Sequence, residues 1–152
     1  MRRALGWRCA IATTQMALRL PDGRPALVLE WLPESLARRL ETGKPFALGE
    51  IRLLLEGLLR GLGAIHAQGL VHADIAPDNL LLESGDLSRP KIADFGIAVE
   101  SGRRHADLGL ARAGRCGFAT PEQLAGDART DLYACRRIGV APRALPGGWR
   151  IG

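Results

Sequence analysis

The chain has 152 residues, which is enough for one domain with a sizeable hydrophobic core. Its apolar fraction of 47% argues against disorder, and 21 Lys and Arg against 16 Asp and Glu give a net charge of +5. The three cysteines are widely spaced and form no CxxC pair, which argues against a zinc site or a disulfide framework and predicts free thiols in a reducing, cytoplasmic setting.

A β-hairpin is the first predicted element. Residues 1–15 match no pattern and are left unassigned. The apolar runs 16–20 and 26–32 flank Asp22-Gly23, a dipeptide typical of hairpin turns, so they predict strand, turn and strand.

Two helices are predicted next. Ser35 is suited to cap a short helix that Gly43 would end. Residues 48–68 form the clearest helix, because apolar residues recur at three- and four-residue steps. Gly57 and Gly61 lower its intrinsic propensity, but they would let another element approach closely. The stripe consists of Ile51, Leu54, Leu55, Leu58, Leu62 and Ile65.

Neither a signal peptide nor a membrane span is expected. Arg8 interrupts the apolar run near the start of the chain. The longest apolar stretch, 51–65, contains Arg52, Glu56 and Arg60, which excludes a membrane span.

The second half begins with short apolar runs that predict small strands, at 70–71, 80–82 and 91–93. Residues 98–117 are rich in Gly and Arg without periodicity, which predicts a loop. Helix signals return at 121–124 and at 130–134. Residues 135–152 lose periodicity and predict an irregular tail.

Three polar residues between these runs have the spacing of a phosphoryl-transfer site. Asp74 follows a helix on a loop and is suited to accept the proton of a hydroxyl group. Asn79, five residues later, offers a neutral oxygen to a magnesium ion. Asp94 follows a small strand and offers a carboxylate, which is also a hard ligand that magnesium prefers. Phosphoryl transfer needs mainly such metal ligands and a base.

Each motif is weak alone, but their order is informative. A His-x-Asp, an Asn, a strand pair, an Asp-Phe-Gly and a Pro-Glu follow one another behind an amphipathic helix. The chain thereby resembles the eukaryotic-type Ser/Thr protein kinases, particularly the bacterial ones. "VHADIAPDN" resembles the catalytic loop, "IADFG" the metal-binding motif and "GRCGFATPEQLAG" the end of the activation segment. "ALVLEWLPESL" resembles the hinge region and "ARTDLYA" the start of the large central helix.

The resemblance implies an α+β, protein-kinase-like fold. Residues 16–134 would be a partial kinase domain, mostly the helical lower lobe with the hinge and a remnant of the upper-lobe sheet. Its implied cofactors are ATP and Mg²⁺. Asp74 would be the catalytic base, and Asn79, also counted with the catalytic residues, and Asp94 would be the metal ligands.

Further roles follow from the resemblance alone. Leu29 would be the gatekeeper, Glu30 and Leu32 would offer hinge backbone groups to adenine, and Leu81 would pack under the adenine ring. Three other roles complete the comparison. His72 and Phe95 would belong to a hydrophobic column below the site, Asp131 would brace the catalytic loop, and Glu122 would form an ion pair.

The sequence also departs from the family. Ala73 and Ala76 replace an arginine that binds activation-loop phosphate and a lysine near the transferred phosphate. Arg115 and Thr120 replace a threonine and an alanine of the activation segment. No lysine precedes Lys44, so the ATP-contacting lysine of the upper lobe has no counterpart.

The near absence of upper-lobe motifs and the change to Arg-, Pro- and Gly-rich sequence after Cys135 predict a truncated or frameshifted kinase that acts on a protein substrate with little transfer activity by itself. The alternative is a pseudokinase or scaffold that binds partners without catalysis. A small-molecule phosphotransferase of the aminoglycoside or choline type shares the His-x-Asp and Asn pattern. A nucleic-acid binder is disfavoured, because the arginines are scattered and the aromatic residues are few.

Overall fold

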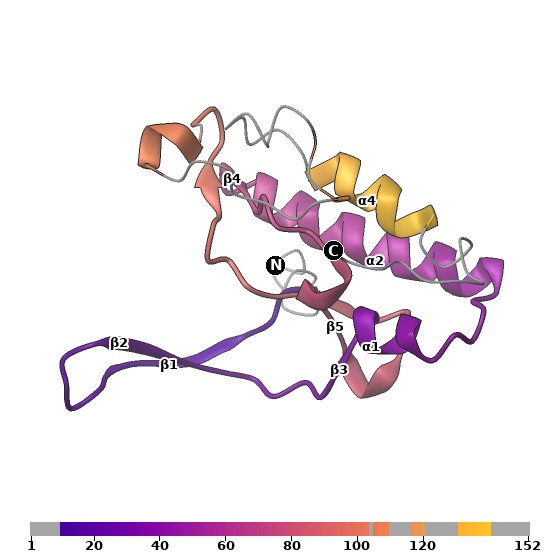
Figure 1. The fold of residues 1–152 in the computed structure, drawn as a ribbon, viewed down its shortest axis with the longest axis horizontal. Coiled ribbons are helices and arrows are strands. Elements are labelled where there is room, and N and C mark those ends of the chain that lie inside the picture. The colour runs from indigo at the N-terminus through magenta and orange to yellow at the C-terminus, as the bar shows by residue number, and fades with distance from the viewer. Residues whose placement is uncertain (1–9, 104, 110–116, 119, 121–130, 141–152) are drawn as a thin grey trace, which may run out of the picture.

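The structure is a computed structural model that describes residues 10–103, 105–109, 117, 118, 120 and 131–140. Within them, a β-hairpin projects from a body built of helices and short strands (Figure 1). The helices are α1 (Leu36–Glu41), α2 (Leu48–His66) and α4 (Asp131–Val140). The strands are β1 (Thr14–Arg19), β2 (Pro25–Leu29), β3 (Glu34–Ser35), β4 (Leu70–Val71), β5 (Leu80–Leu82), β6 (Pro90–Ile92) and β7 (Val99–Glu100).

The predicted hairpin is confirmed. β1 and β2 pair antiparallel, with Leu18 opposite Ala26, and Gly23 takes a positive φ of 84° in the turn between them. That backbone region is easily reached only by glycine. Apolar side chains of both strands, such as Met16 and Leu27, are exposed.

Helix α1 also forms as predicted. The hydroxyl oxygen of Ser35 accepts a hydrogen bond from the Arg38 backbone N–H at 3.3 Å, which satisfies one free donor of the first turn. Gly43 follows the helix with a φ of 66°, and its N–H donates to the Leu40 carbonyl.

Helix α2 is the centre of the core, and its apolar stripe faces inward as predicted. Five of the six stripe residues are buried, and Leu55 packs partly buried against the same core. The stripe meets α1, the small sheet and α4, whose Ala134, Cys135 and Ile138 are buried. Leu36, Leu80, Leu82 and Ile92 complete the centre of this core.

The small sheet has the antiparallel order β3-β5-β6. A segment that sequence reasoning left unassigned pairs with its free edge: the Ile92 N–H donates to Ala10 at 2.9 Å, and the Ala12 N–H donates to Ile92 at 2.8 Å. Ile11 therefore forms a parallel bridge with Ile92. Residues 10–12, which the sequence left unassigned, therefore belong to the edge of this sheet.

Two glycines of α2 let the sheet lie directly on the helix, as predicted. A Cβ atom at Gly57 would come within 2.6 Å of the Pro90 ring, and one at Gly61 within 2.8 Å of the Ile92 side chain. No real Cβ contact is that short, so β6 approaches α2 through positions that exclude a side chain.

Two predictions about the second half require correction. The expected loop 98–117 contains strand β7, which pairs antiparallel with β4, and a 3-10 turn at His105–Leu108. The expected irregular tail begins as helix, since α4 runs to Val140. Burial of the apolar side chains of α4 against α2 stabilises this helix, although the periodicity of its own sequence is weak. The helix signal at 121–124 lies outside the described residues.

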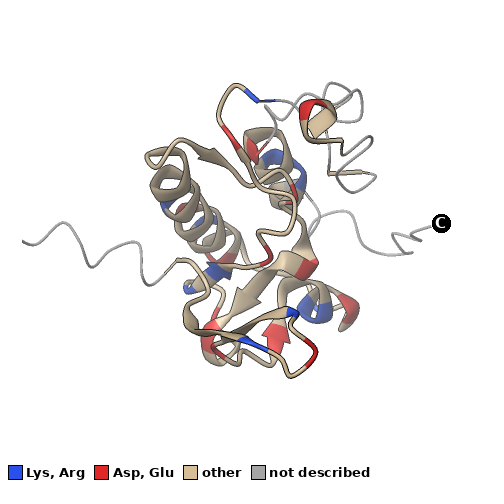
Figure 2. Ribbon diagram, turned by 90° about the vertical axis from the view of Figure 1, so that its left-hand side faces the viewer, with Lys and Arg blue, Asp and Glu red and all other residues tan. Residues whose placement is uncertain are grey.

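Two further properties of the described residues concern their helices and the distribution of their charges. None of their helices is long and apolar enough to cross a bilayer. Lys and Arg lie on several separate elements and alternate with Asp and Glu (Figure 2).

Substitution of Gly57 by alanine tests the contact between α2 and β6. Alanine favours a helix by about 1 kcal/mol over glycine, but the added methyl group would clash with the rigid Pro90 ring. We expect G57A to lower the free energy of unfolding by about 1–3 kcal/mol in urea denaturation. G63A is the matched control, because a Cβ at Gly63 meets nothing within 4 Å. It should stabilise the fold by about 0.5–1 kcal/mol, and equal effects of the two variants would contradict the close approach.

Candidate functional site

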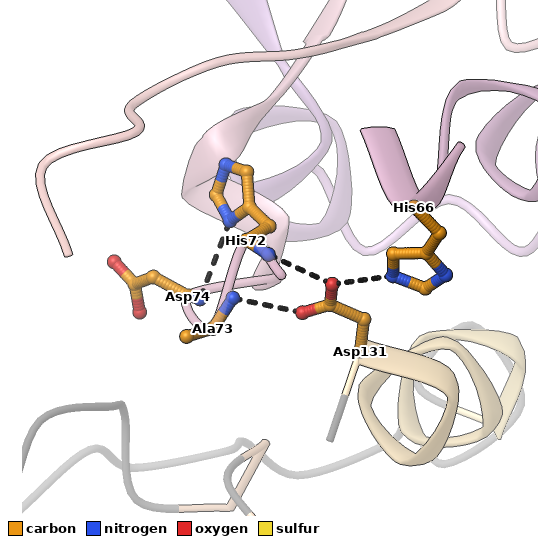
Figure 3. A network of polar contacts seen from close by, with 5 residues as sticks. All are labelled: His66, His72, Ala73, Asp74 and Asp131. Atoms are coloured by element: carbon orange, nitrogen blue, oxygen red, sulfur yellow. Dashed lines mark hydrogen bonds and ion pairs between the residues drawn. The ribbon is translucent and has the colours of Figure 1, made fainter. Parts of the chain in front are cut away.

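The catalytic-loop segment is held by one buried carboxylate. Asp131, at the start of α4, is 2% exposed. Its Oδ2 accepts the His72 backbone N–H at 2.9 Å, and its Oδ1 accepts the Ala73 N–H at 2.8 Å. The His66 Nε2 lies 2.9 Å from the same Oδ2 (Figure 3). The bracing contact expected of Asp131 is therefore present, and His66 is an additional partner that sequence reasoning missed.

His72 links the loop to the strand that precedes Asp94. Its Nδ1 accepts the Asp74 backbone N–H at 3.2 Å, so the ring proton resides on Nε2, which donates to the Ala93 carbonyl at 3.0 Å. The ring is fully buried and lies edge-on to Phe95, with centroids 4.7 Å apart. Burial lowers the pKa of His72 below its ordinary value, against the opposing effect of nearby Asp131. A neutral imidazole fits this pattern of one donor and one acceptor.

Asn79 orients the side chain of Asp74. The Asn79 Nδ2 donates to the Asp74 backbone carbonyl and to the Asp74 Oδ2, both at 2.8 Å. Because both partners are acceptors, the amide nitrogen faces Asp74 and the amide oxygen faces elsewhere. Asn79 is buried at the end of a 3-10 turn (Pro77–Asn79), directly before β5.

Asp94 lies beside Asn79 through the β5–β6 pairing. Leu80 is opposite Ile92, and the Ala93 N–H donates to the Asn79 carbonyl at 2.9 Å. Asp94 is exposed and takes a positive φ of 64°, and its Oδ1 accepts the Gly96 N–H at 3.1 Å. The structure thus brings Asp74, Asn79 and Asp94 together, although Asp74 and Asp94 are 20 residues apart in the sequence.

This donor set fits a magnesium ion. The carboxylate of Asp94 and the amide oxygen of Asn79 are hard oxygen donors, and magnesium takes few protein ligands because it keeps waters and phosphate oxygens. Among the described residues, no group of three or more His, Cys, Asp or Glu side chains could hold a metal ion.

The predicted hinge residues lie at the base of the hairpin. Leu29 ends β2 and is 47% exposed, while Glu30 and Leu32 are half-buried. Leu81 lies in the centre of β5, half-buried, opposite Lys91 in β6. The strand that carries Leu81 also begins immediately after Asn79, so the predicted adenine floor and a predicted metal ligand are adjacent in the chain.

Lys91 is a buried charged residue near the candidate site that sequence reasoning missed. Its Nζ lies 2.7 Å from the Glu30 Oε2. Burial raises the pKa of Glu30, but the hydrogen bonds from Lys91 and from the Thr13 N–H outweigh it and lower the pKa overall. A lysine between Pro90 and Ile92 in a buried strand was the available signal, because a buried cation needs an anion.

The two alanines that depart from the family are buried. Ala73 is 3% exposed and Ala76 is 1% exposed. Ala73 has a positive φ of 67°, a strained region for a residue with a Cβ atom. The backbone at both positions is therefore packed into the body of the protein. Glu122 and Arg115 lie outside the described residues.

Comparisons with known proteins bear on the family of the chain. A sequence profile described as "Protein kinase domain" matches residues 11–138. The chain is 35% identical over 120 residues to the serine/threonine-protein kinase Pkn1 of Myxococcus xanthus, covering 73% of this chain and 17% of Pkn1. It is 34% identical over 120 residues to PknL of Mycobacterium tuberculosis, covering 74% of this chain and 29% of PknL. It is also 40% identical over 79 residues to RqkA of Deinococcus radiodurans, a DNA damage-responsive kinase by name, covering 49% of this chain and 12% of RqkA. The chain thus spans less than a third of the length of these three relatives.

Substitution of Asp131 by asparagine tests the brace. Asparagine offers one acceptor oxygen in place of two and turns an N–H group toward a backbone donor. We expect D131N to lower the free energy of unfolding by about 1–3 kcal/mol, the cost of a buried donor without a partner. D22N is the control: Asp22 pairs with Arg24 at the exposed hairpin turn, and its loss should change stability by less than about 0.5–1 kcal/mol. Equal effects in chemical denaturation would refute a bracing role.

The buried His72 predicts a pH dependence of stability. Its folded-state pKa lies below the ordinary 6.5, so the unfolded chain binds the proton more readily. Burial of His72 therefore does not lower the free energy of unfolding above about pH 6.5. Below that value the free energy of unfolding decreases as the pH decreases. We expect H72F, which keeps a ring beside Phe95, to lose less stability than wild type between about pH 7 and about pH 5. Parallel stability curves for the two proteins would contradict this assignment.

Proposed function

The chain belongs to the protein kinase domain family, and from this premise we propose that it supports ATP-dependent phosphoryl transfer to a serine or threonine of a protein substrate. The observation that carries the proposal is the arrangement of Asp74, Asn79 and Asp94 around one hydrogen-bonded framework. A binding module without chemistry has no need of a base and two metal ligands in this arrangement.

ATP and magnesium are the cofactors that protein kinases use. In this proposal, Asp94 and the amide oxygen of Asn79 hold the metal ion. When bound, the metal neutralises charge on the phosphate groups during transfer. Leu81 forms the floor under adenine, Leu29 is the gatekeeper, and backbone groups of Glu30 and Leu32 pair with the base.

Asp74 is the proposed acceptor of the substrate hydroxyl proton. The Asn79 amide fixes one carboxylate oxygen, Oδ2, at 2.8 Å, and the Asp74 N–H is fixed by His72. The carboxylate is half-buried at the edge of the body, where a protein hydroxyl can reach it. Orientation of an acceptor is a large part of catalysis in phosphoryl transfer, since little covalent help is required.

Transfer by this chain alone should be slow. No lysine precedes Lys44, and Ala76 carries no charge toward the transferred phosphate. Each missing cation removes electrostatic stabilisation of the transition state.

The proposed location of the protein is the cytoplasm. The thiol of Cys135 is free and buried, and burial is the main cause that raises its pKa to about 12, which suits a reducing compartment.

Nucleotide binding tests the first half of the proposal. A ligand that binds only the folded state raises the unfolding midpoint, so magnesium-ATP should raise the midpoint of the wild-type chain more than ATP alone. D94N should abolish the magnesium-dependent part, while its ligand-free midpoint stays near that of wild type because Asp94 is exposed. D86N, at an exposed carboxylate of the connector after β5, is the matched control and should respond as wild type. A magnesium-dependent rise that survives in D94N would refute the metal assignment.

Transfer itself is tested with radiolabelled ATP and two acceptor classes, a mixture of protein substrates and a mixture of aminoglycosides and choline. We expect slow labelling of proteins only, and loss of that labelling in D74A. Nucleotide binding without any transfer would favour a scaffold, and labelling of the small molecules would favour the other phosphotransferase class.

A further inference from the structure

One charged pair in the body of the protein has no role in the proposed chemistry. Lys91 lies in the centre of β6, where its side chain is 7% exposed, and its partner Glu30 is 20% exposed. Lys91 is one of only two lysines in the chain. Removing a lysine from water is unfavourable unless the charge is paired and hydrogen-bonded, so this position depends on its anion.

Glu30 joins three segments that are distant in sequence. Its Oε2 accepts from Lys91 at 2.7 Å, and its Oε1 accepts the Thr13 N–H at 2.6 Å. Its own backbone N–H donates to the Thr13 carbonyl at 2.9 Å. The carboxylate therefore ties the residue that follows β2 both to the segment before β1 and to β6.

Lys91, the other partner of the ion pair, lies close to proposed site residues. Lys91 is opposite Leu81 in the β5–β6 register, and Asp94 follows Lys91 by three residues. Ile92, its neighbour in β6, donates its N–H to the Ala10 carbonyl, accepts the Ala12 N–H at its own carbonyl, and packs against Gly61 of α2. Lys91 thus lies on a strand that is paired at both edges, whereas Glu30 directly follows β2 of a hairpin that projects from the body (Figure 1).

We propose that the Lys91–Glu30 ion pair is a positioning device that fixes the hinge backbone at residues 30–32 at a set distance from Leu81 and Asp94. The inference deepens the proposed function, on which it rests, because its consequence is a preformed adenine site. Neither side chain is assigned contact with nucleotide. Their effect is to hold the hinge amides and carbonyls, which would otherwise move with the hairpin, over the floor at Leu81.

A purely structural ion pair would behave differently, and a double variant separates the two roles. E30Q leaves Lys91 charged without an anion, and K91M leaves the Glu30 carboxylate without a cation, so each single variant should lower the unfolding midpoint. Replacing both charges restores electrical neutrality, and such replacements of buried pairs often recover stability. In E30Q/K91M the glutamine oxygen still accepts the Thr13 N–H, but the link to β6 is gone.

The test compares wild type, E30Q, K91M and E30Q/K91M in the full chain, with R52M/E56Q as the control for an exposed ion pair on α2. We expect the double variant to recover much of the unfolding midpoint lost by the single variants. Its magnesium-ATP affinity should nevertheless remain at least about tenfold weaker than that of wild type, since a misplaced positioning group costs of that order or more. Amide hydrogen exchange should be faster at residues 30–32 and unchanged within α2.

Two results would overturn the inference and are distinguishable. If the wild type binds magnesium-ATP and the double variant binds it equally well with unchanged exchange at residues 30–32, the pair has only a structural role. If the wild type shows no binding of magnesium-ATP, the proposed function fails and the inference fails with it. The control variant should match wild type in affinity and in hinge exchange.

Discussion

The geometry of the site depends on the buried carboxylate of Asp131. Two backbone amides of the catalytic loop and the ring of His66 converge on its two oxygens. A carboxylate 2% exposed is tolerated only because these donors replace water. The requirement works in both directions: the charge needs the loop amides, and the loop backbone keeps its strained conformation at Ala73 because the carboxylate holds it there.

From Asp131 a set of hydrogen bonds reaches Asp74 and Asn79 and ends at Ala93, directly before Asp94. His72 connects the amide of Asp74 to the carbonyl of Ala93, and Asn79 connects Asp74 to the start of β5. The Ala93 amide returns to the Asn79 carbonyl, which closes the set beside Asp94. Apart from the Asp131 carboxylate, these bonds are made by backbone groups and by the buried side chains of His72 and Asn79, and burial favours the neutral form of His72.

Local patterns predicted the elements whose stability is largely local or follows from one apolar stripe. Helix α2 shows its period in Ile51, Leu54 and Leu58, and Ser35 and Gly43 delimit α1. The predicted grouping of Asp74, Asn79 and Asp94 rested on family resemblance as well as spacing, and the structure brings them together. Strand β7 and the second half of α4 were missed, because a two-residue strand and a glycine-containing helix are stabilised by distant partners rather than by their own sequence. The pairing of Lys91 with Glu30 spans 61 residues, and no local pattern can supply it.

The burial of Ala73 and Ala76 clarifies what their departure from the family pattern changes. The loop conformation at Ala73 is fixed through its backbone N–H, a contact that is independent of the side chain at that position. Loss of an arginine there removes a phosphate-binding group, yet it leaves the bond to Asp131 and the orientation of Asp74 intact. Control of such a site by activation-loop phosphate would need a cation at residue 73. The orientation of the proposed base is therefore supported by Asp131 and His72 and depends on no side-chain contact from residue 73.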